Sequence, residues 1–323
     1  MPKPRKLQIA LSETPYYHLI SRCVRRAFLC GKTEAYNFEH RRDWILARLH
    51  QLTQMFAIDI AAFALMSNHY HIVVRVDAAK AALWTYKDIT DRWQILFRLP
   101  VIVEGYLNRV SSCDAENKAV ETILESWRSR LCDISWFMRC LNEHIARRAN
   151  AEDHCTGRFW EGRFKSQALL DEKAVLTAMA YVDLNPIRAQ NAVTPETSDY
   201  TSIQQRLGKA RHSAAHCKLL SFAEDRHQGN ILLHLPYQFV DYIELVEWTG
   251  RQMRPDKRGA IKAATPPILA RLGIPDHYWL QNCQKLETEF HQVIGPIILI
   301  KQFCRSLNLN WLHGQTACRR SFG

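Results

Sequence analysis

Phe63-Ala64-Leu65-Met66-Ser67-Asn68-His69-Tyr70-His71-Ile72-Val73-Val74-Arg75-Val76 is an apolar stretch interrupted by a polar turn and two histidines. The turn predicts an antiparallel hairpin, whose second strand carries the histidines. Side chains at positions i and i+2 of a strand point to the same face, so His69 and His71 would stand side by side, about 7 Å apart at Cα. Neutral imidazoles are common metal ligands, and the pair therefore indicates a metal site. The pair alone leaves open the alternative of two partly buried structural histidines.

Strands and helices alternate on both sides of this hairpin. Apolar spacing of two or of three to four residues distinguishes the strands from the helices, and Asp171 is expected to cap the last helix before Asn185-Pro186 ends it. The predicted elements are, in order, a strand at 16–24, a helix at 39–56, strands at 58–65 and 68–76, a helix at 134–149, a strand at 164–170 and a helix at 172–184.

The composition favours a globular protein that binds a polyanion. Of the 323 residues, 47% are hydrophobic, and 43 Lys and Arg outnumber 32 Asp and Glu, for a formal net charge of +11. Such an excess attracts nucleic acid before other partners. A basic surface with no such partner is the alternative that charge alone leaves open.

The cysteines and the apolar stretches indicate the cellular compartment of the protein. None of the ten cysteines forms a Cys-x-x-Cys pair, which argues against a zinc knuckle or a redox pair. The basic start of the chain precedes no apolar run of signal-peptide length, and no stretch approaches the roughly 20 apolar residues of a membrane span. We therefore expect a cytoplasmic protein with free thiols and no membrane partner.

The chain is long enough for more than one domain. We predict a first domain at 1–192 with an insertion at about 80–130, a connector at 193–229 and a helical C-terminal extension at 230–323.

A second candidate for chemistry lies on the helix at 172–184 and just after it. Tyr181 and Asn185 are four residues apart, so a helix would place them on one face, one turn from each other. A phenol can attack a phosphodiester, and an amide oxygen could complete a two-histidine metal site. Taken alone, a surface tyrosine and an asparagine at a helix end before proline would be the simpler interpretation.

The combination and order of these motifs resemble the single-tyrosine HUH transposases, and most of all the REP-associated tyrosine transposases with their insertion-sequence relatives. The resemblance covers about Pro15 to Ala192, without the stretch near 80–130. It rests on His69-Tyr70-His71, on the turn Gly157-Arg158-Phe159-Trp160-Glu161-Gly162-Arg163-Phe164-Lys165, and on Tyr181-Val182-Asp183-Leu184-Asn185-Pro186-Ile187-Arg188.

The resemblance implies an α+β fold with a central antiparallel sheet of ferredoxin-like or RRM-like topology and flanking helices, followed here by the helical C-terminal part. It implies a divalent ion, Mg²⁺ or Mn²⁺, held by His69, His71 and Asn185. It also implies that Tyr181 attacks the scissile phosphate, forming a 5′-phosphotyrosine link and releasing a 3′-hydroxyl. Tyr70 points to the opposite face of the strand and is expected to pack in the core.

Several basic and aromatic residues are candidates for contact with a single DNA strand. Guanidinium and ammonium groups can bind phosphates while an aromatic face stacks on a base. The candidates are Arg22, Arg25, Arg26, Arg158, Trp160, Arg163 and Lys165. Phe159 and Phe164 fit base stacking and core packing equally well.

The function we predict is that of a transposase: metal-dependent cleavage and rejoining of single-stranded or hairpin DNA at hairpin-forming repeats. We expect it to act in the cytoplasm of a bacterium, in association with the nucleoid. A homodimer stays open. One alternative is a catalytically silent DNA- or RNA-binding regulator with the same fold. The other is a replication-initiation or mobilisation nuclease of the same chemistry, although those proteins more often carry a third histidine or a second tyrosine.

Overall fold

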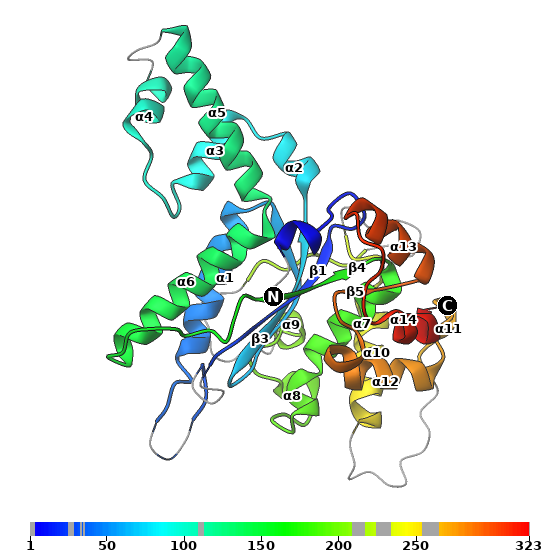
Figure 1. Ribbon diagram of the computed structural model, residues 1–323. Coiled ribbons are helices and arrows are strands. Elements are labelled where there is room, and N and C mark those ends of the chain that lie inside the picture. The colour runs from blue at the N-terminus through cyan, green and yellow to red at the C-terminus, as the bar shows by residue number, and fades with distance from the viewer. Residues whose placement is uncertain are drawn as a thin grey trace.

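A five-stranded sheet with the order β2-β3-β1-β4-β5 lies at the centre of the fold (Figure 1). The computed structural model describes residues 4–24, 29–32, 34, 36–108, 113–208, 217–223, 234–253 and 265–322. The strands are β1 (Tyr16–Arg22), β2 (Ile58–Leu65), β3 (His69–Val76), β4 (Lys165–Leu169) and β5 (Val293–Ile294).

The first four strands pair in antiparallel fashion throughout. Their order, β2-β3-β1-β4, and the helices between them give the β-α-β-β-α-β arrangement of ferredoxin-like folds. The predicted fold class is therefore confirmed. The short strand β5 adds a parallel pair, with Ala168 opposite Val293, and this pair was not expected from the sequence.

The hairpin between β2 and β3 forms as predicted. The turn is closed by a hydrogen bond from the Met66 amide to the His69 carbonyl oxygen of 2.9 Å. Along β3 the side chains alternate, so that Tyr70 points to one face of the sheet and His69 and His71 point to the other. Tyr70 is fully buried, and its hydroxyl donates to Asn142, which confirms the expected core position.

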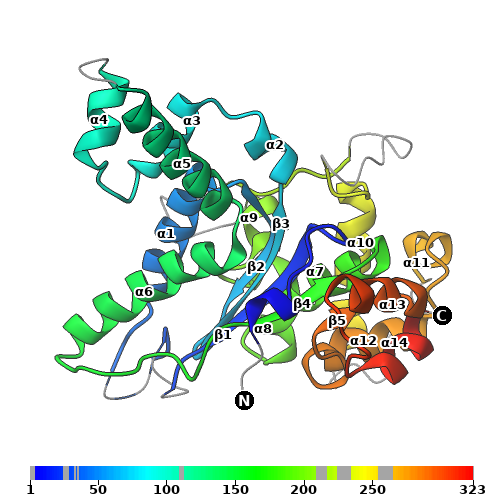
Figure 2. The same ribbon diagram turned by 45° about the horizontal axis from the view of Figure 1, so that its top comes forward.

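Helices cover both faces of the sheet (Figures 1 and 2). Helices α1 (Arg41–Met55) and α6 (Ile134–Glu152) pack together on the face that receives Tyr70. Helix α7 (Glu172–Asp183) packs on β2 and β3 from the opposite side. It begins at Asp171, whose carboxylate accepts a hydrogen bond of 2.8 Å from the Ala174 amide, as a capping residue should.

The predicted insertion is helical. Its helices are α2 (Ala78–Ala82), α3 (Tyr86–Trp93), α4 (Val101–Leu107) and α5 (Asp114–Leu131), and Figure 1 shows them projecting from one end of the sheet. Helix α3 starts in a capping box made by Thr85 and Asp88, and Pro100 stands immediately before α4. Trp93 of α3 is stacked on Trp127 of α5, with ring centroids 4.6 Å apart, and this contact packs α3 against α5 within the insertion.

The remaining helices follow α7 in the chain. They are α8 (Asn185–Arg188), α9 (Ser202–Arg206), α10 (Phe239–Gln252), α11 (Pro267–Arg271), α12 (Asp276–Glu289), α13 (Ile297–Ser306) and α14 (Gln315–Phe322), with short 3₁₀ turns at Arg5–Leu7 and Pro195–Thr197. Within the described part of the chain, no helix is both long and apolar enough to cross a bilayer.

The C-terminal segment is joined closely to the first domain. Helix α12 packs along α7, and β5 hydrogen-bonds to β4. The close approach depends on Gly295, where φ is +149° and an added Cβ would lie 2.9 Å from Leu170 Cβ. The division into a domain, a connector and an extension stays a prediction, but α12 and β5 do contact the sheet domain directly.

Asp183 holds the end of α7 against α9 and α10. The carboxylate is completely buried, and it accepts hydrogen bonds from the Ser202 hydroxyl, the Ile203 amide and the Tyr242 hydroxyl. Burial raises the pKa of the Asp183 carboxyl above its usual value. This side chain therefore fixes the helix that carries Tyr181, and its partners lie on α9 and α10, not at the histidines.

Replacing Asp183 with alanine should lower the free energy of unfolding by about 3 kcal/mol, because the substitution leaves three buried donors without an acceptor. Urea unfolding measures the loss. Asp91→Ala is the matched control, because Asp91 forms an exposed ion pair of 2.6 Å with Lys87 and should cost at most about 0.5 kcal/mol. Equal effects of the two substitutions would contradict an anchoring role for Asp183.

Candidate active site

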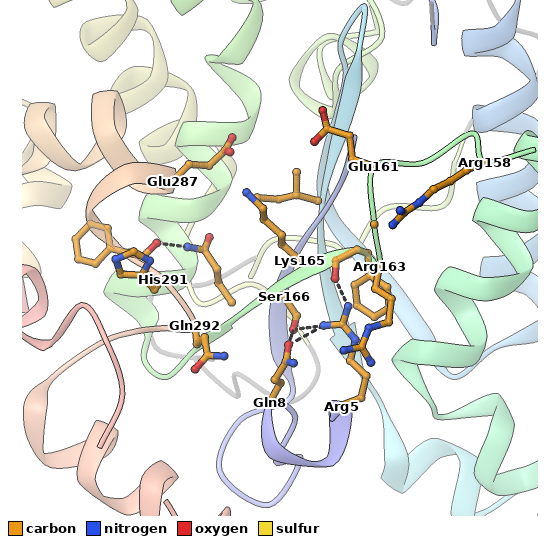
Figure 3. A pocket seen from close by; sticks show the side chains of 15 residues that line it. Arg5, Gln8, Arg158, Glu161, Arg163, Lys165, Ser166, Glu287, His291 and Gln292 are labelled. Atoms are coloured by element: carbon orange, nitrogen blue, oxygen red, sulfur yellow. Dashed lines mark hydrogen bonds between the residues drawn. The ribbon is translucent and has the colours of Figure 1, made fainter. Parts of the chain in front are cut away.

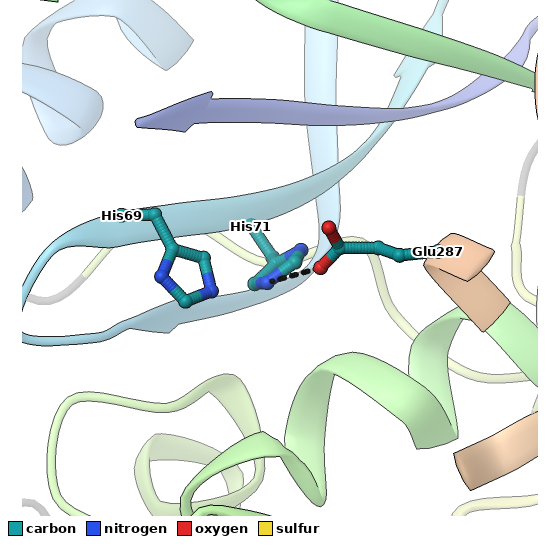
Figure 4. A group of neighbouring side chains, drawn as sticks. All are labelled: His69, His71 and Glu287. Atoms are coloured by element: carbon teal, nitrogen blue, oxygen red, sulfur yellow. Dashed lines mark ion pairs between the residues drawn. The ribbon is translucent and has the colours of Figure 1, made fainter. Parts of the chain in front are cut away.

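His69, His71 and Glu287 form a group that could hold a metal ion. Their candidate ligand atoms all lie within 4.8 Å of one another. The histidines come from β3 and Glu287 comes from the last turn of α12, and Figure 4 shows the carboxylate directed at the His71 ring. The packing of α12 on α7 thus brings a residue more than 200 positions later in the chain to the predicted histidine pair.

A chain of hydrogen bonds defines which ring nitrogen of His71 carries the proton. The Gln167 amide nitrogen donates to the Phe290 carbonyl oxygen at 2.6 Å, so the Gln167 carbonyl oxygen must accept from His18 Nδ1, 2.7 Å away. His18 Nε2 is then an acceptor, and His71 Nδ1, 3.0 Å away, must donate to it. The lone pair of His71 therefore lies on Nε2, on the side of Glu287.

His71 Nε2 is buried and has no hydrogen-bond partner. It lies 3.4 Å from Glu287 Oε1, so a nitrogen lone pair faces a carboxylate oxygen. Burial, followed by the charges of its neighbours, keeps the pKa of His71 well below its usual value, so the ring stays neutral. Two facing acceptors in a buried site call for a cation between them, and this donor set fits a divalent ion.

His69 is arranged in the same way. Its Nδ1 is hydrogen-bonded to the Asn68 side-chain oxygen, which leaves Nε2 with a lone pair. Burial, together with the nearby Arg22, lowers the pKa of His69 to about 4. Metal-ligating histidines are usually neutral, and the ring nitrogen that does not bind the metal is held by a hydrogen bond.

Tyr181 lies beside this group. Its hydroxyl donates to Glu287 Oε1 at 2.9 Å, and its ring makes edge contacts with His71 and His18. Burial raises the pKa of the phenol, and the carboxylate of Glu287 raises it further, while the guanidinium of Arg188 opposes the increase. The Arg188 guanidinium carbon is 3.9 Å from the Tyr181 ring centroid, so a cation is already placed at the phenol.

Asn185 follows Tyr181 by one turn, at the start of α8. Its side chain is buried, its Oδ1 accepts a hydrogen bond of 3.0 Å from Arg188, and its Nδ2 has no hydrogen-bond partner. Arg188 therefore links the two residues that were predicted to act together. Asn185 stays a predicted ligand, and it would have to exchange Arg188 for the ion.

A cavity of about 600 Å³ opens next to Glu287 (Figure 3). The predicted phosphate contacts Arg158, Arg163 and Lys165 all line it, together with Arg5, which was not predicted. The Arg5 guanidinium lies 3.7 Å from the Phe164 ring centroid and donates to Ser166 Oγ at 3.1 Å. Burial and the neighbouring Arg163 lower the pKa of Arg5 to about 10, as expected where cations gather without an equal number of carboxylates.

The other predicted DNA contacts lie in different surroundings. Arg22, at the end of β1, has a guanidinium nitrogen 3.8 Å from Glu287 Oε2 and borders the metal-ligand group. Trp160 is half-buried, donates to the Asn142 carbonyl oxygen at 2.9 Å, and packs edge-on against Tyr70. Phe159 and Phe164 are buried, in favour of core packing. Arg25 and Arg26 lie outside the described residues.

Three residues of this site were not predicted from the sequence: Glu287, His18 and Arg188. His18 was within reach of sequence reasoning, since in an antiparallel pairing of β1 with β3 it lies opposite Val73, which shares a face with His71. Arg188 belongs to the tyrosine motif, but the motif alone predicted no role for it. No local signal marked Glu287, because its proximity depends on how α12 packs on α7.

Comparisons with known proteins give one structural match. The solved structure of a REP-associated tyrosine transposase bound to a REP hairpin is 10% identical in sequence, with a TM-score of 0.38, and the match covers 68% of this chain and all of that one. No protein-family model matches the sequence. The search of curated proteins also found no match.

Substitution of His18 by leucine should weaken Mn²⁺ binding by about 10- to 100-fold without removing a ligand, because His71 Nδ1 loses the acceptor that fixes its ring. Isothermal titration with Mn²⁺ measures the change, and circular dichroism verifies the fold. His144→Leu, on α6 across the sheet, is the matched control and should bind Mn²⁺ as the unaltered protein does. Unchanged affinity in His18→Leu would mean that His18 does not orient a metal ligand.

Proposed function

We propose that this protein is a metal-dependent endonuclease and strand transferase that acts on single-stranded DNA, at hairpin-forming repeats, through a covalent link to Tyr181. The observation that carries the proposal is the shared contact at Glu287. Glu287 Oε1 accepts a hydrogen bond of 2.9 Å from the Tyr181 hydroxyl. The same oxygen lies 3.4 Å from His71 Nε2, the nitrogen that carries the lone pair. A nucleophile and a candidate cation site are therefore in direct contact.

The residues of the chain would divide the reaction among them. Tyr181 Oη attacks the phosphorus, an oxygen–phosphorus bond forms, and the bond from phosphorus to the 3′ oxygen breaks, which releases a 3′-hydroxyl. Glu287 is placed to take the phenol proton, because it already accepts that hydrogen bond. A divalent cation such as Mg²⁺ or Mn²⁺, when bound, supplies positive charge to the non-bridging phosphate oxygens.

Arg188 supports the same step from the other side of the ring. Because the phenol is buried, its ionised form is disfavoured, and a guanidinium 3.9 Å from the ring centroid offsets part of that cost. The link to Tyr181 conserves the energy of the phosphodiester, so that a free 3′-hydroxyl can later attack it and rejoin a strand. Cleavage and rejoining therefore need no external energy source.

The cavity beside Glu287 supports a nucleic-acid substrate. Arg5, Arg158, Arg163 and Lys165 surround it, and the last three are exposed. We propose that these cations bind the phosphates that flank the scissile one. The homodimer and the association with the nucleoid stay predictions.

A silent regulator with the same fold fits the site less well. Binding alone gives no reason to bury the unpaired His71 Nε2 against a carboxylate, an arrangement that costs stability in the absence of a cation. A replication or mobilisation nuclease would use the same cluster of residues but would act on a different DNA substrate from that of a transposase. Comparison of hairpin and unstructured single strands as substrates separates it from the transposase.

Tyr181→Phe should abolish the covalent protein–DNA adduct and leave DNA affinity within about twofold, because only the attacking oxygen is removed. Incubation of a labelled hairpin oligonucleotide with Mg²⁺ or Mn²⁺, followed by denaturing electrophoresis, detects the adduct. Tyr70→Phe is the matched control, since Tyr70 lies on the opposite face of the same sheet, and it should still form the adduct. Cleavage at an unchanged rate by Tyr181→Phe would refute the assignment of the nucleophile.

The ligand set is tested by metal titration of four variants. His69→Ala, His71→Ala and Glu287→Ala should each weaken Mn²⁺ binding by at least about 100-fold, because each removes one atom of the group. Asn185→Ala should weaken it only if its Oδ1 leaves Arg188 for the ion, as we propose, and a loss of about tenfold is expected. Full affinity in Asn185→Ala would remove Asn185 from the ligand set, and full affinity in Glu287→Ala would make Glu287 a proton acceptor only.

A further inference from the structure

We propose that a groove on the outer surface of α6 is a second binding site for unpaired nucleotides, separate from the catalytic cluster. The groove has a volume of about 730 Å³ and is formed by α6, α1, the end of α3 and the residues just after α3. The insertion at 80–130 supplies one of its walls, so the site exists only because the chain carries that insertion. We call it the α6 groove.

The aromatic wall of the α6 groove suits base stacking. Phe97 and Trp136 are half-buried, with ring centroids 6.3 Å apart, and both line the cavity. Trp93 lies behind them, 4.6 Å from Phe97, and is itself stacked on Trp127. These half-buried rings therefore rest on a rigid support, and an aromatic face can stack on any base.

The charges of the α6 groove suit phosphates. Arg48, Arg139, Arg147 and Arg148 line it against one carboxylate, that of Glu143. Arg139 and Arg147 both pair with Glu143, but their side chains remain 64% and 79% exposed, so one carboxylate is shared by two accessible cations. The excess positive charge beside the aromatic rings favours a polyanion whose bases are free to stack.

Two of the arginines are held in place by neighbours that are not acidic. Arg48 Nε donates to the Cys140 carbonyl oxygen at 3.1 Å, and the Arg148 guanidinium lies 3.9 Å from the Trp44 ring centroid. Neither contact neutralises the charge. A fixed cation costs less entropy on binding than a free one, so these groups are organised to receive an anion.

The α6 groove is not an extension of the catalytic cavity. Helix α6 receives the Tyr70 hydroxyl on one face of the sheet, whereas His71 and Tyr181 meet on the other. An occupant of the groove is therefore separated from Tyr181 by the sheet. The inference does not require that Tyr181 cleaves DNA, and its failure would leave the proposed function untouched.

Photo-cross-linking of the full-length Tyr181→Phe variant tests the proposal. The probe is a thymidine oligonucleotide of about ten residues that carries 5-iodouracil, used with EDTA so that no metal-dependent reaction takes place. Peptide mapping is expected to find cross-links at Phe97 or Trp136. Absence of cross-links at both residues, with cross-links only around the catalytic cavity, would overturn the proposal.

Cross-linking of charge variants provides a second test of the proposal. The double substitution Arg139→Gln with Arg147→Gln should reduce cross-linking at the α6 groove by about tenfold and weaken its dependence on salt. Both residues are exposed, so the fold should be unaffected. Arg251→Gln is the matched control, because Arg251 is an exposed arginine that pairs with Glu247 four residues earlier at 3.2 Å. An equal loss in the control would show a general charge effect and refute the site.

Three nucleic acids decide what the α6 groove recognises. A uridine ribo-oligonucleotide should cross-link as the thymidine strand does if any unpaired strand is accepted, and weaker cross-linking would restrict the site to DNA; either result supports it. A duplex of the same length should bind the groove at least about tenfold more weakly, because its bases are not free to stack. Duplex binding that is as strong and as sensitive to the arginine substitutions would overturn the proposal.

Discussion

The contact of α12 with α7 is the constraint on which the candidate active site depends. It places the carboxylate of Glu287 within hydrogen-bonding distance of the Tyr181 hydroxyl and next to the lone pair of His71. Without that contact, β3 would present two histidines and α7 a buried phenol, with no anionic group to bring a cation to them. The helical C-terminal segment is therefore part of the candidate active site, and the strand pairing of β5 with β4 fixes it to the sheet.

Burial determines the protonation states of the titratable groups in the site. The imidazoles of His18, His69 and His71 are kept neutral, and the phenol of Tyr181 is kept protonated, because a low-dielectric interior disfavours their charged forms. Burial would also raise the pKa of Glu287, but the hydrogen bond from Tyr181 and the charge of Arg22 lower it below its usual value. The half-buried carboxylate of Glu287, 3.8 Å from the Arg22 guanidinium, faces the lone pairs of neutral histidines, and this set of ligand atoms fits a divalent cation.

Sequence reasoning found the parts of the site that depend on local periodicity. The hairpin, the shared face of His69 and His71, the inward position of Tyr70 and the cap at Asp171 all follow from the two-residue period of strands and the chemistry of helix ends. Glu287 could not be found in this way, because the packing of a helix residue 106 positions after Tyr181 has no local signature. The same limit applies to β5, which is two residues long and becomes a strand only through its neighbour β4.

The two faces of the sheet keep the two proposed nucleic-acid surfaces apart. The turn at 157–164 leaves the end of α6, crosses to β4, and places Arg158 and Arg163 at the cavity beside Glu287. Trp160 anchors the turn to α6 through its hydrogen bond to Asn142 and to the core through its contact with Tyr70. The turn therefore lies at the cavity beside Glu287, whereas the α6 groove lies on the other face of the sheet and shares no lining residue with that cavity. Phosphate contacts at Arg158 and Arg163 would orient a strand bound in that cavity relative to Tyr181.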